Sequence, residues 1–141
     1  MALTLTVVTP ERALPPIACD HVTVVAVDGQ LGVRPGHAAL VGLLAGGFLQ
    51  PRRGGRALPA IAIRGGVGQV ARDQVLIITE AAVPAGQVDR AAVQRRLDAL
   101  PAGTAHETER AFLRAQLDLP AGELSTDEML SGAKAAIDAE R

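Results

Sequence analysis

The spacing of apolar positions changes near residue 84 of the chain. Before that point, short β-branched apolar runs are separated by Gly, Pro or Asp every several residues, a pattern typical of an antiparallel sandwich or barrel. The runs are LTLTVV, HVTVVAV, AIAI, VGQVA and VLIIT. The sequence therefore predicts a first part made of strands.

From Pro84 onward, Ala and charged residues dominate, and the apolar positions recur at helical spacing. Pro and Gly breaks divide this part into three predicted short helices, near residues 89–100, 105–119 and 126–140. Isolated helices of fewer than ~12 to 15 residues are marginal in water. These helices are therefore expected to pack on each other, on the strands or on a partner.

Two domains follow from this division: a β-sandwich over residues 1–84 and a helical part over residues 85–141. The segments Thr104–Glu107 and Ser125–Glu128 both fit a capping box, in which a hydroxyl and an acid cover free amides at a helix start. Each segment predicts where a helix begins.

Composition excludes several classes of protein. The net charge is −1, and the basic residues do not form a stripe that would follow a phosphate backbone, so nucleic acid is not expected as a partner. Trp and Tyr are missing and Phe occurs twice, which disfavours carbohydrate binding. Cys19 is the only cysteine, which excludes an internal disulfide.

The N-terminus alternates Leu with Thr and lacks a basic leader, so we interpret it as a strand and expect a cytoplasmic protein. The longest apolar run, residues 38–49, is interrupted by glycines and is shorter than the ~18 to 20 residues of a spanning helix. The membrane is therefore expected to be contacted only indirectly.

One motif could indicate a dinucleotide-binding enzyme. Gly66 to Ala71, GVGQVA, fits G-x-G-x-x-A, and Asp89 follows about twenty residues later. Such a site needs a helix directly after the glycines to hold the pyrophosphate, whereas RDQ and the strand-like VLIIT follow here. We interpret the motif as a glycine-rich strand and turn.

Other candidate catalytic groups are equally weak. The three histidines lack metal-site spacing, and neighbours in the trio Cys19-Asp20-His21 would point to opposite faces of a strand. The only serines, Ser125 and Ser131, lie in the tail, so no nucleophile elbow is present. We predict no catalytic residue, no cofactor and no metal site.

The segment DGQLGVRPGHAALVG, residues 28–42, favours a contact surface instead. Pro35 and Gly36 meet the requirements of a type II turn, and Asp28-Gly29 is a hairpin signal, so QLGV becomes a short strand between two fixed turns. The result is a rigid loop with polar residues at its edge. Ordered loops lose less conformational entropy on docking.

This segment, together with TLTVVTPERAL and GGVGQVARDQVLIITEAAV, resembles the ε subunit of F-type ATP synthases, called δ in mitochondria. The resemblance implies a sandwich of about ten strands, a helical hairpin and no catalysis. It also implies binding to the γ subunit and the c-subunit ring, with the helical part able to reach α and β subunits. The protein would sit peripherally at the cytoplasmic face of the cell (inner) membrane, coupling ion translocation to ATP synthesis and restraining ATP hydrolysis.

The resemblance also assigns a contact loop for the c ring, made of Gln30, Leu31, Val33, Arg34, Pro35, Gly36 and His37. Many relatives carry an acidic residue where this chain has Gln30, so charge pairing is not expected at that position. The alternative for His37 is a turn residue that bonds to nearby backbone.

The helical part departs from the relatives that bind ATP there. Their first helix opens with [IL]-D-x-x-R-A, and the matching positions here are Val88, Asp89 and Ala92, without the arginine. Arg90 lies two residues before Ala92 and is turned about 200° around the helix. We therefore predict weak or no ATP binding.

Two alternatives from other classes remain. A free-standing β-sandwich adaptor would share the composition but would not need a ring-facing loop, and co-purification with γ separates the two. A dinucleotide-dependent enzyme would bind its cofactor at Gly66 and Gly68, which titration with a nicotinamide cofactor would detect.

Overall fold

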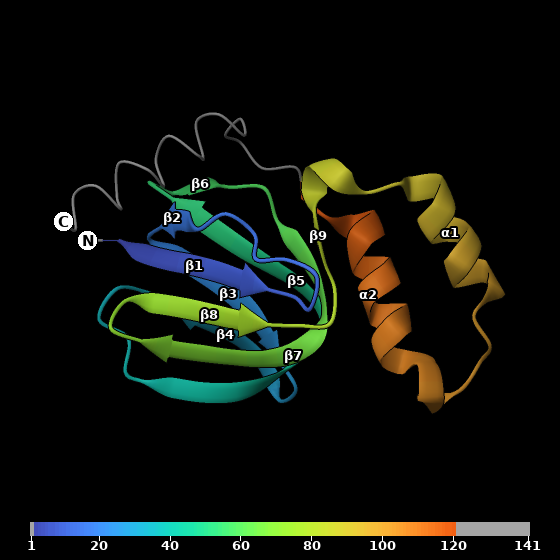
Figure 1. Ribbon diagram of the computed structural model, residues 1–141, viewed down its shortest axis with the longest axis horizontal. Coiled ribbons are helices and arrows are strands. Elements are labelled where there is room, and N and C mark those ends of the chain that lie inside the picture. The colour runs from blue at the N-terminus through green and yellow to red at the C-terminus, as the bar shows by residue number, and fades with distance from the viewer. Residues whose placement is uncertain (1, 121–141) are drawn as a thin grey trace.

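The computed structural model describes residues 2–120, which form a β-sandwich with two α-helices at one end (Figure 1). The strands are β1 (Leu3–Val8), β2 (Ile17–Cys19), β3 (His21–Ala26), β4 (Gly29–Val33), β5 (Leu40–Arg53), β6 (Arg56–Ala57), β7 (Ile61–Ala71), β8 (Gln74–Ile78) and β9 (Ala82–Pro84). The helices are η1 (Ala85–Gln87), α1 (Arg90–Ala99), η2 (Thr104–His106) and α2 (Glu107–Asp118), where η marks a short 3₁₀ turn.

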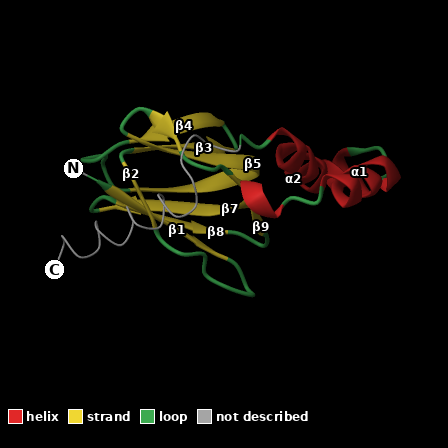
Figure 2. Ribbon diagram, turned by 90° about the horizontal axis from the view of Figure 1, so that it is seen from above, coloured by secondary structure: helices red, strands yellow, loops and turns green. Residues whose placement is uncertain are grey.

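Two long strands, β5 and β7, connect the two layers of the sandwich. The strand order is β2-β1-β8-β7-β5-β3-β4, with β6 added to β5 and β9 added to β7. Figure 2 shows β3, β4 and β5 in one layer and β1, β7 and β8 in the other. The first half of β5 pairs with the second half of β7, and that half of β7 also pairs with β8. The second half of β5 pairs with β3 and β6. The predicted two-part organisation of strands followed by helices is confirmed.

The predicted sandwich of about ten strands is confirmed, with nine strands in the described part of the chain. One strand pair differs from the predicted antiparallel pattern: β1 runs parallel to β8, with Leu5 opposite Val75. The reason lies in the connection after β1. The chain returns through β2, which occupies one edge of β1 in antiparallel fashion and leaves the other edge for a strand distant in sequence. A parallel pair requires such a long connection.

The first two predicted helices are present, at slightly shorter lengths, and the third, near residues 126–140, lies outside the described residues. Asp89 caps α1, because its Oδ1 accepts a hydrogen bond from the backbone N–H of Ala92 at 3.1 Å. The predicted capping box at Thr104 is wrong. Thr104 lies inside the η2 turn, and the α2 N-cap, His106, makes no side-chain capping bond.

The buried residues form two separate clusters. The larger one fills the space between the sandwich layers and includes Leu3, Leu5, Val22, Leu49, Ile63 and Ile77. The smaller one lies between α2 and the sheet, where Phe112 and Ala115 pack on Ala62. The helices are therefore not needed to complete the larger core.

Helix α2 approaches the sheet closely at a glycine of β5. A Cβ added to Gly46 would lie 2.8 Å from the carbonyl oxygen of Thr108 and 3.0 Å from the Cβ of Ala111. Glu109 on the same helix forms ion pairs with Arg64 of β7 at 2.8 Å and with Arg96 of α1 at 2.5 Å. One carboxylate thus joins the sandwich and both helices.

We predict that residues 1–84 fold without the helical part, because the larger core contains no residue of α1 or α2. The fragment should unfold cooperatively by circular dichroism. Exposing Ala62 and its neighbours should lower its free energy of unfolding by about 1–3 kcal/mol relative to the full chain. A fragment without a cooperative transition would contradict independent folding.

The glycines of GVGQVA have a structural explanation. Gly66 and Gly68 lie within β7, which leads through a tight turn into β8 without an intervening helix, so the interpretation as a glycine-rich strand is confirmed. Gly66 has φ of +128°, and a Cβ there would lie 2.0 Å from the carbonyl oxygen of Ile78. Only glycine permits this approach between β7 and β8.

Gly66→Ala should therefore lower the free energy of unfolding by at least about 2 kcal/mol in urea titrations, through backbone strain and steric overlap. Gly42→Ala is the matched control, because a Cβ at Gly42 of β5 meets no atom within 4 Å. Equal stabilities of the two variants would contradict this account of Gly66.

Candidate interaction surface

The predicted type II turn at residues 34–37 is confirmed. Gly36 has φ of +85°, and the N–H of His37 donates to the carbonyl oxygen of Arg34 at 3.1 Å. A positive φ at the third residue is what this turn type requires. The turn is therefore fixed by its own backbone.

The other end of the segment is also fixed, by the hairpin between β3 and β4. Ala26 pairs with Gly29, so Val27 and Asp28 form the tip, and Gly29, at φ of +135°, begins β4. The expected strand over QLGV is confirmed as part of β4. Both turns hold the segment at the edge of the sheet, since β3 is the only strand among residues 2–120 that pairs with β4.

The residues of the expected contact loop divide by burial. Gln30, Arg34 and Gly36 are exposed, and Pro35 and His37 are half-buried. Val33 is 0% exposed and Leu31 packs against the larger core. Val33 therefore supports the loop from within and is not on its surface, which corrects its inclusion as a contact. Val33 lies two residues after Leu31, and such residues of a strand face the same side of the sheet, so the sequence already indicated that both are buried.

His37 bonds to its own backbone neighbourhood. Its Nδ1–H donates to the carbonyl oxygen of Ala38 at 2.7 Å, and its ring is half-buried. This geometry supports the turn-residue interpretation of His37 and leaves Nε2 as its remaining polar atom.

Sequence reasoning missed one residue of this surface, Asp73. Its Oδ1 accepts a hydrogen bond from the N–H of Gly36 at 2.7 Å, across 37 positions of sequence. Asp73 lies in the tight turn between β7 and β8. The pair Arg72-Asp73 between two apolar runs signalled that turn, but nothing in the sequence indicated its partner.

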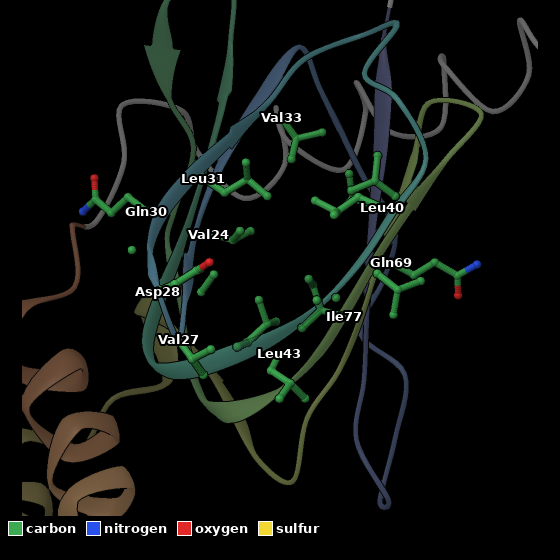
Figure 3. A pocket seen from close by; sticks show the side chains of 18 residues that line it. Val24, Val27, Asp28, Gln30, Leu31, Val33, Leu40, Leu43, Gln69 and Ile77 are labelled. Atoms are coloured by element: carbon green, nitrogen blue, oxygen red, sulfur yellow. The ribbon is translucent and has the colours of Figure 1, made fainter.

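An apolar cavity of about 560 Å³ opens between the layers beside this loop (Figure 3). Leu31, Val33 and Leu40 point into it, whereas Gln30 and Gln69 point away. Asp28 at its rim is the one titratable residue in its lining. The cavity therefore offers no acid–base pair or nucleophile for catalysis.

The outer face of β5, β7 and β8 carries exposed apolar side chains. Leu43, Val67 and Ile78 lie directly opposite one another across the three strands, and Val41 follows two residues before Leu43. Val41, Leu43 and Ile78 are 68%, 63% and 52% exposed. We call these four residues the apolar face. A contiguous group of large exposed apolar residues is typical of a protein–protein contact.

The residues of the trio Cys19-Asp20-His21 have separate surroundings. Burial, and secondarily the Asp20 carboxylate, raise the pKa of the Cys19 thiol to about 12, so the thiol stays protonated near neutral pH. Asp20 accepts a hydrogen bond from the N–H of Gly54. Among residues 2–120, no three His, Cys, Asp or Glu side chains gather in a way that could hold a metal ion, and no helix is long and apolar enough to cross a membrane.

The positions that match the ATP motif have structural partners. Asp89 caps α1, and Ala92 supplies the N–H that Asp89 accepts. Arg90 donates through Nη1 to the carbonyl oxygen of Leu117 at 2.8 Å, which ties α1 to the end of α2. Val88 precedes the cap and is half-buried.

Comparison with known proteins identifies this architecture. Residues 2–85 match the family described as ATP synthase, Delta/Epsilon chain, beta-sandwich domain. The sandwich and its helical extension thus define a protein class that occurs in rotary ATP synthases. The chain belongs to the ATP synthase delta/epsilon chain family.

Curated relatives share this family. The ATP synthase epsilon chain of Synechococcus sp. (strain JA-2-3B'a(2-13)) is 35% identical over 98 residues, covering 70% of this chain and 71% of the relative. That of Moorella thermoacetica is 32% identical over 120 residues, covering 80% of this chain and 90% of the relative. The similarity to the second extends into the helical part.

Solved structures share the fold. A chain in the Euglena gracilis mitochondrial ATP synthase, from a structure of OSCP, F1 and the c-ring, superimposes with a TM-score of 0.60 at 24% identity, covering 96% of this chain and 81% of that one. At this identity the likeness shows the fold alone.

Proposed function

We propose that the chain is the non-catalytic ε subunit of an F1Fo ATP synthase, placed in the central stalk between γ and the c ring. The family and the epsilon-chain relatives support this assignment. In this position the chain touches the membrane only through the ring, at the cytoplasmic face of the inner membrane. Its function is to transmit torque and to hold its partners in register.

The single observation that carries the ring contact is the fixed loop at residues 30–37. It is bounded by two turns, its apolar residues Leu31 and Val33 are anchored in the core, and its polar residues Gln30 and Arg34 are exposed. A loop that transmits torque must not yield when it is pushed, and a preformed loop also loses little entropy on docking. Gln30, Arg34 and His37 then supply polar contacts to the ring.

The apolar face supports the contact with γ. Three of its residues, Val41, Leu43 and Ile78, are more than half exposed, Val67 is 36% exposed, and none of the four carries a charge. Burial of such side chains by a partner contributes a favourable free energy of about 25 cal/mol per Å² of apolar surface. The helical part lies beyond the bend of β5 and β7, so both surfaces stay accessible while α2 is docked (Figure 2).

Gly36→Val should uncouple the ring contact, because a β-branched residue resists positive φ by about 1–2 kcal/mol and depopulates the turn roughly five- to thirtyfold. ATP synthesis by vesicles that contain the complete complex should fall several-fold. Gly54→Val is the matched control. Gly54 has φ of +61° and, like Gly36, open space around its Cβ position, but it lies in the turn between β5 and β6.

Both variants carry similar backbone strain, so similar stability and different coupling would support the loop as the ring contact. Equal ATP synthesis with both variants would rule the loop out. Recovery of γ with the chain from native membranes distinguishes the stalk subunit from a free-standing adaptor, which would leave γ behind.

We further propose that the helical part binds ATP weakly or not at all. Asp89 and Arg90 are occupied by the α1 cap and by Leu117, and Ala92 cannot contact a phosphate. Calorimetry of the full chain with ATP and Mg²⁺ should detect no binding at micromolar concentrations. Micromolar binding that Asp89→Ala abolishes would contradict this proposal.

A further inference from the structure

We infer that Asp73 is a positioning residue for the contact loop: its carboxylate holds the turn at residues 34–37 in the orientation that docks. The effect on docking rests on the proposed function, whereas the hydrogen bond that holds the turn does not. The hydrogen bond from the N–H of Gly36 to Oδ1 of Asp73, at 2.7 Å, is the connecting contact.

The backbone N–H of Gly36 is free of the turn's own closing hydrogen bond and can bond to another element. In a type II turn the closing bond joins the first and fourth residues, here Arg34 and His37. The N–H of Gly36 takes no part in that bond, so the turn can keep its internal geometry and still swing as a unit. A bond from Gly36 to another element therefore sets where the turn points.

Asp73 is itself firmly held. Arg72 and Asp73 have φ of +53° and +61°, the left-handed conformation that a two-residue hairpin turn requires. The backbone carbonyl of Asp73 accepts from the N–H of Thr4 at 3.0 Å, which joins the turn to the start of β1. The carboxylate thus extends from a joint between three strands, β1, β7 and β8, toward the loop.

The residue type fits both tasks. Asp and Asn tolerate left-handed φ better than other residues with a side chain, and Asp adds a charged acceptor, which makes the stronger kind of hydrogen bond. Glycine would satisfy the backbone equally well but would leave the Gly36 amide without this partner. The carboxylate therefore has a role beyond shaping its own turn.

Three full-length variants separate these roles. Asp73→Asn keeps an acceptor and the φ preference, Asp73→Gly keeps only the backbone conformation, and Arg72→Gly introduces the same flexibility one residue away while the carboxylate stays. The solvent exchange rate of the Gly36 amide proton, measured by NMR, should rise about fivefold in Asp73→Gly, as expected for loss of roughly 1 kcal/mol. It should rise by a smaller factor in Asp73→Asn, whose neutral acceptor makes a weaker hydrogen bond, and it should change less than twofold in Arg72→Gly.

The functional measurement adds each variant to ε-depleted ATP synthase in vesicles and titrates the concentration that restores half of the ATP synthesis. Asp73→Gly should require about five times more protein than the wild type, Asp73→Asn should require an intermediate amount, and Arg72→Gly should match the wild type. Unchanged Gly36 exchange in Asp73→Gly would overturn the inference, as would equal losses in Asp73→Gly and Arg72→Gly.

Faster exchange without any loss of ATP synthesis would also overturn the positioning role. Gly36→Val in the same assay then identifies the cause. If Gly36→Val lowers ATP synthesis, the loop is a contact that does not depend on Asp73. If it does not, the loop itself is not the ring contact, and the proposed function of this surface fails.

Discussion

The ladder between β5 and β7 is the interaction on which the rest of the structure depends. It runs without a change of register from Leu40 opposite Val70 to Leu49 opposite Ile61. Its two halves have different neighbours, because β8 pairs with the second half of β7, whereas β3 and β6 pair chiefly with the second half of β5. Glycines lie near the middle, where Gly65 and Gly66 take positive φ and Gly46 receives the backbone of α2. The bent ladder between β5 and β7 thus both closes the sandwich and provides the surface on which α2 packs.

The sequence predicted the strands whose side chains are β-branched and alternate in polarity. β1, β3 and β8 follow the expected runs closely. β5 could not be recognised in the same way, since its sequence, LVGLLAGGFLQPRR, combines glycines and a proline with apolar residues on both faces. Two of those glycines face residues distant in sequence: Gly46 lies against Thr108 and Gly47 against Val25. The intrinsic strand propensities of the residues could not predict these glycines, because the residues that pack against them are brought there by the tertiary fold.

The candidate site shows the same limit. Both turns that fix the contact loop were predicted, because each depends on residues adjacent in sequence. Asp73 was not, because its link to Gly36 spans 37 positions. The capping box at Thr104 failed for a related reason: the chain enters α2 through a 3₁₀ turn after Gly103, so the hydroxyl is not at the cap. Asp89 needs to reach only one amide three residues on, and it caps α1.

The alternation along β4 separates two roles that often conflict in a binding surface. Leu31 and Val33 pack in the core, whereas the side chains of Gln30 and Arg34 are exposed to solvent. Side chains at the outward positions can therefore be exchanged with little effect on folding, since surface substitutions usually change stability by no more than about 0.5 kcal/mol. The strand is a natural place to retarget the protein: a library varied only at positions 30 and 34 would explore new partners on an unchanged scaffold.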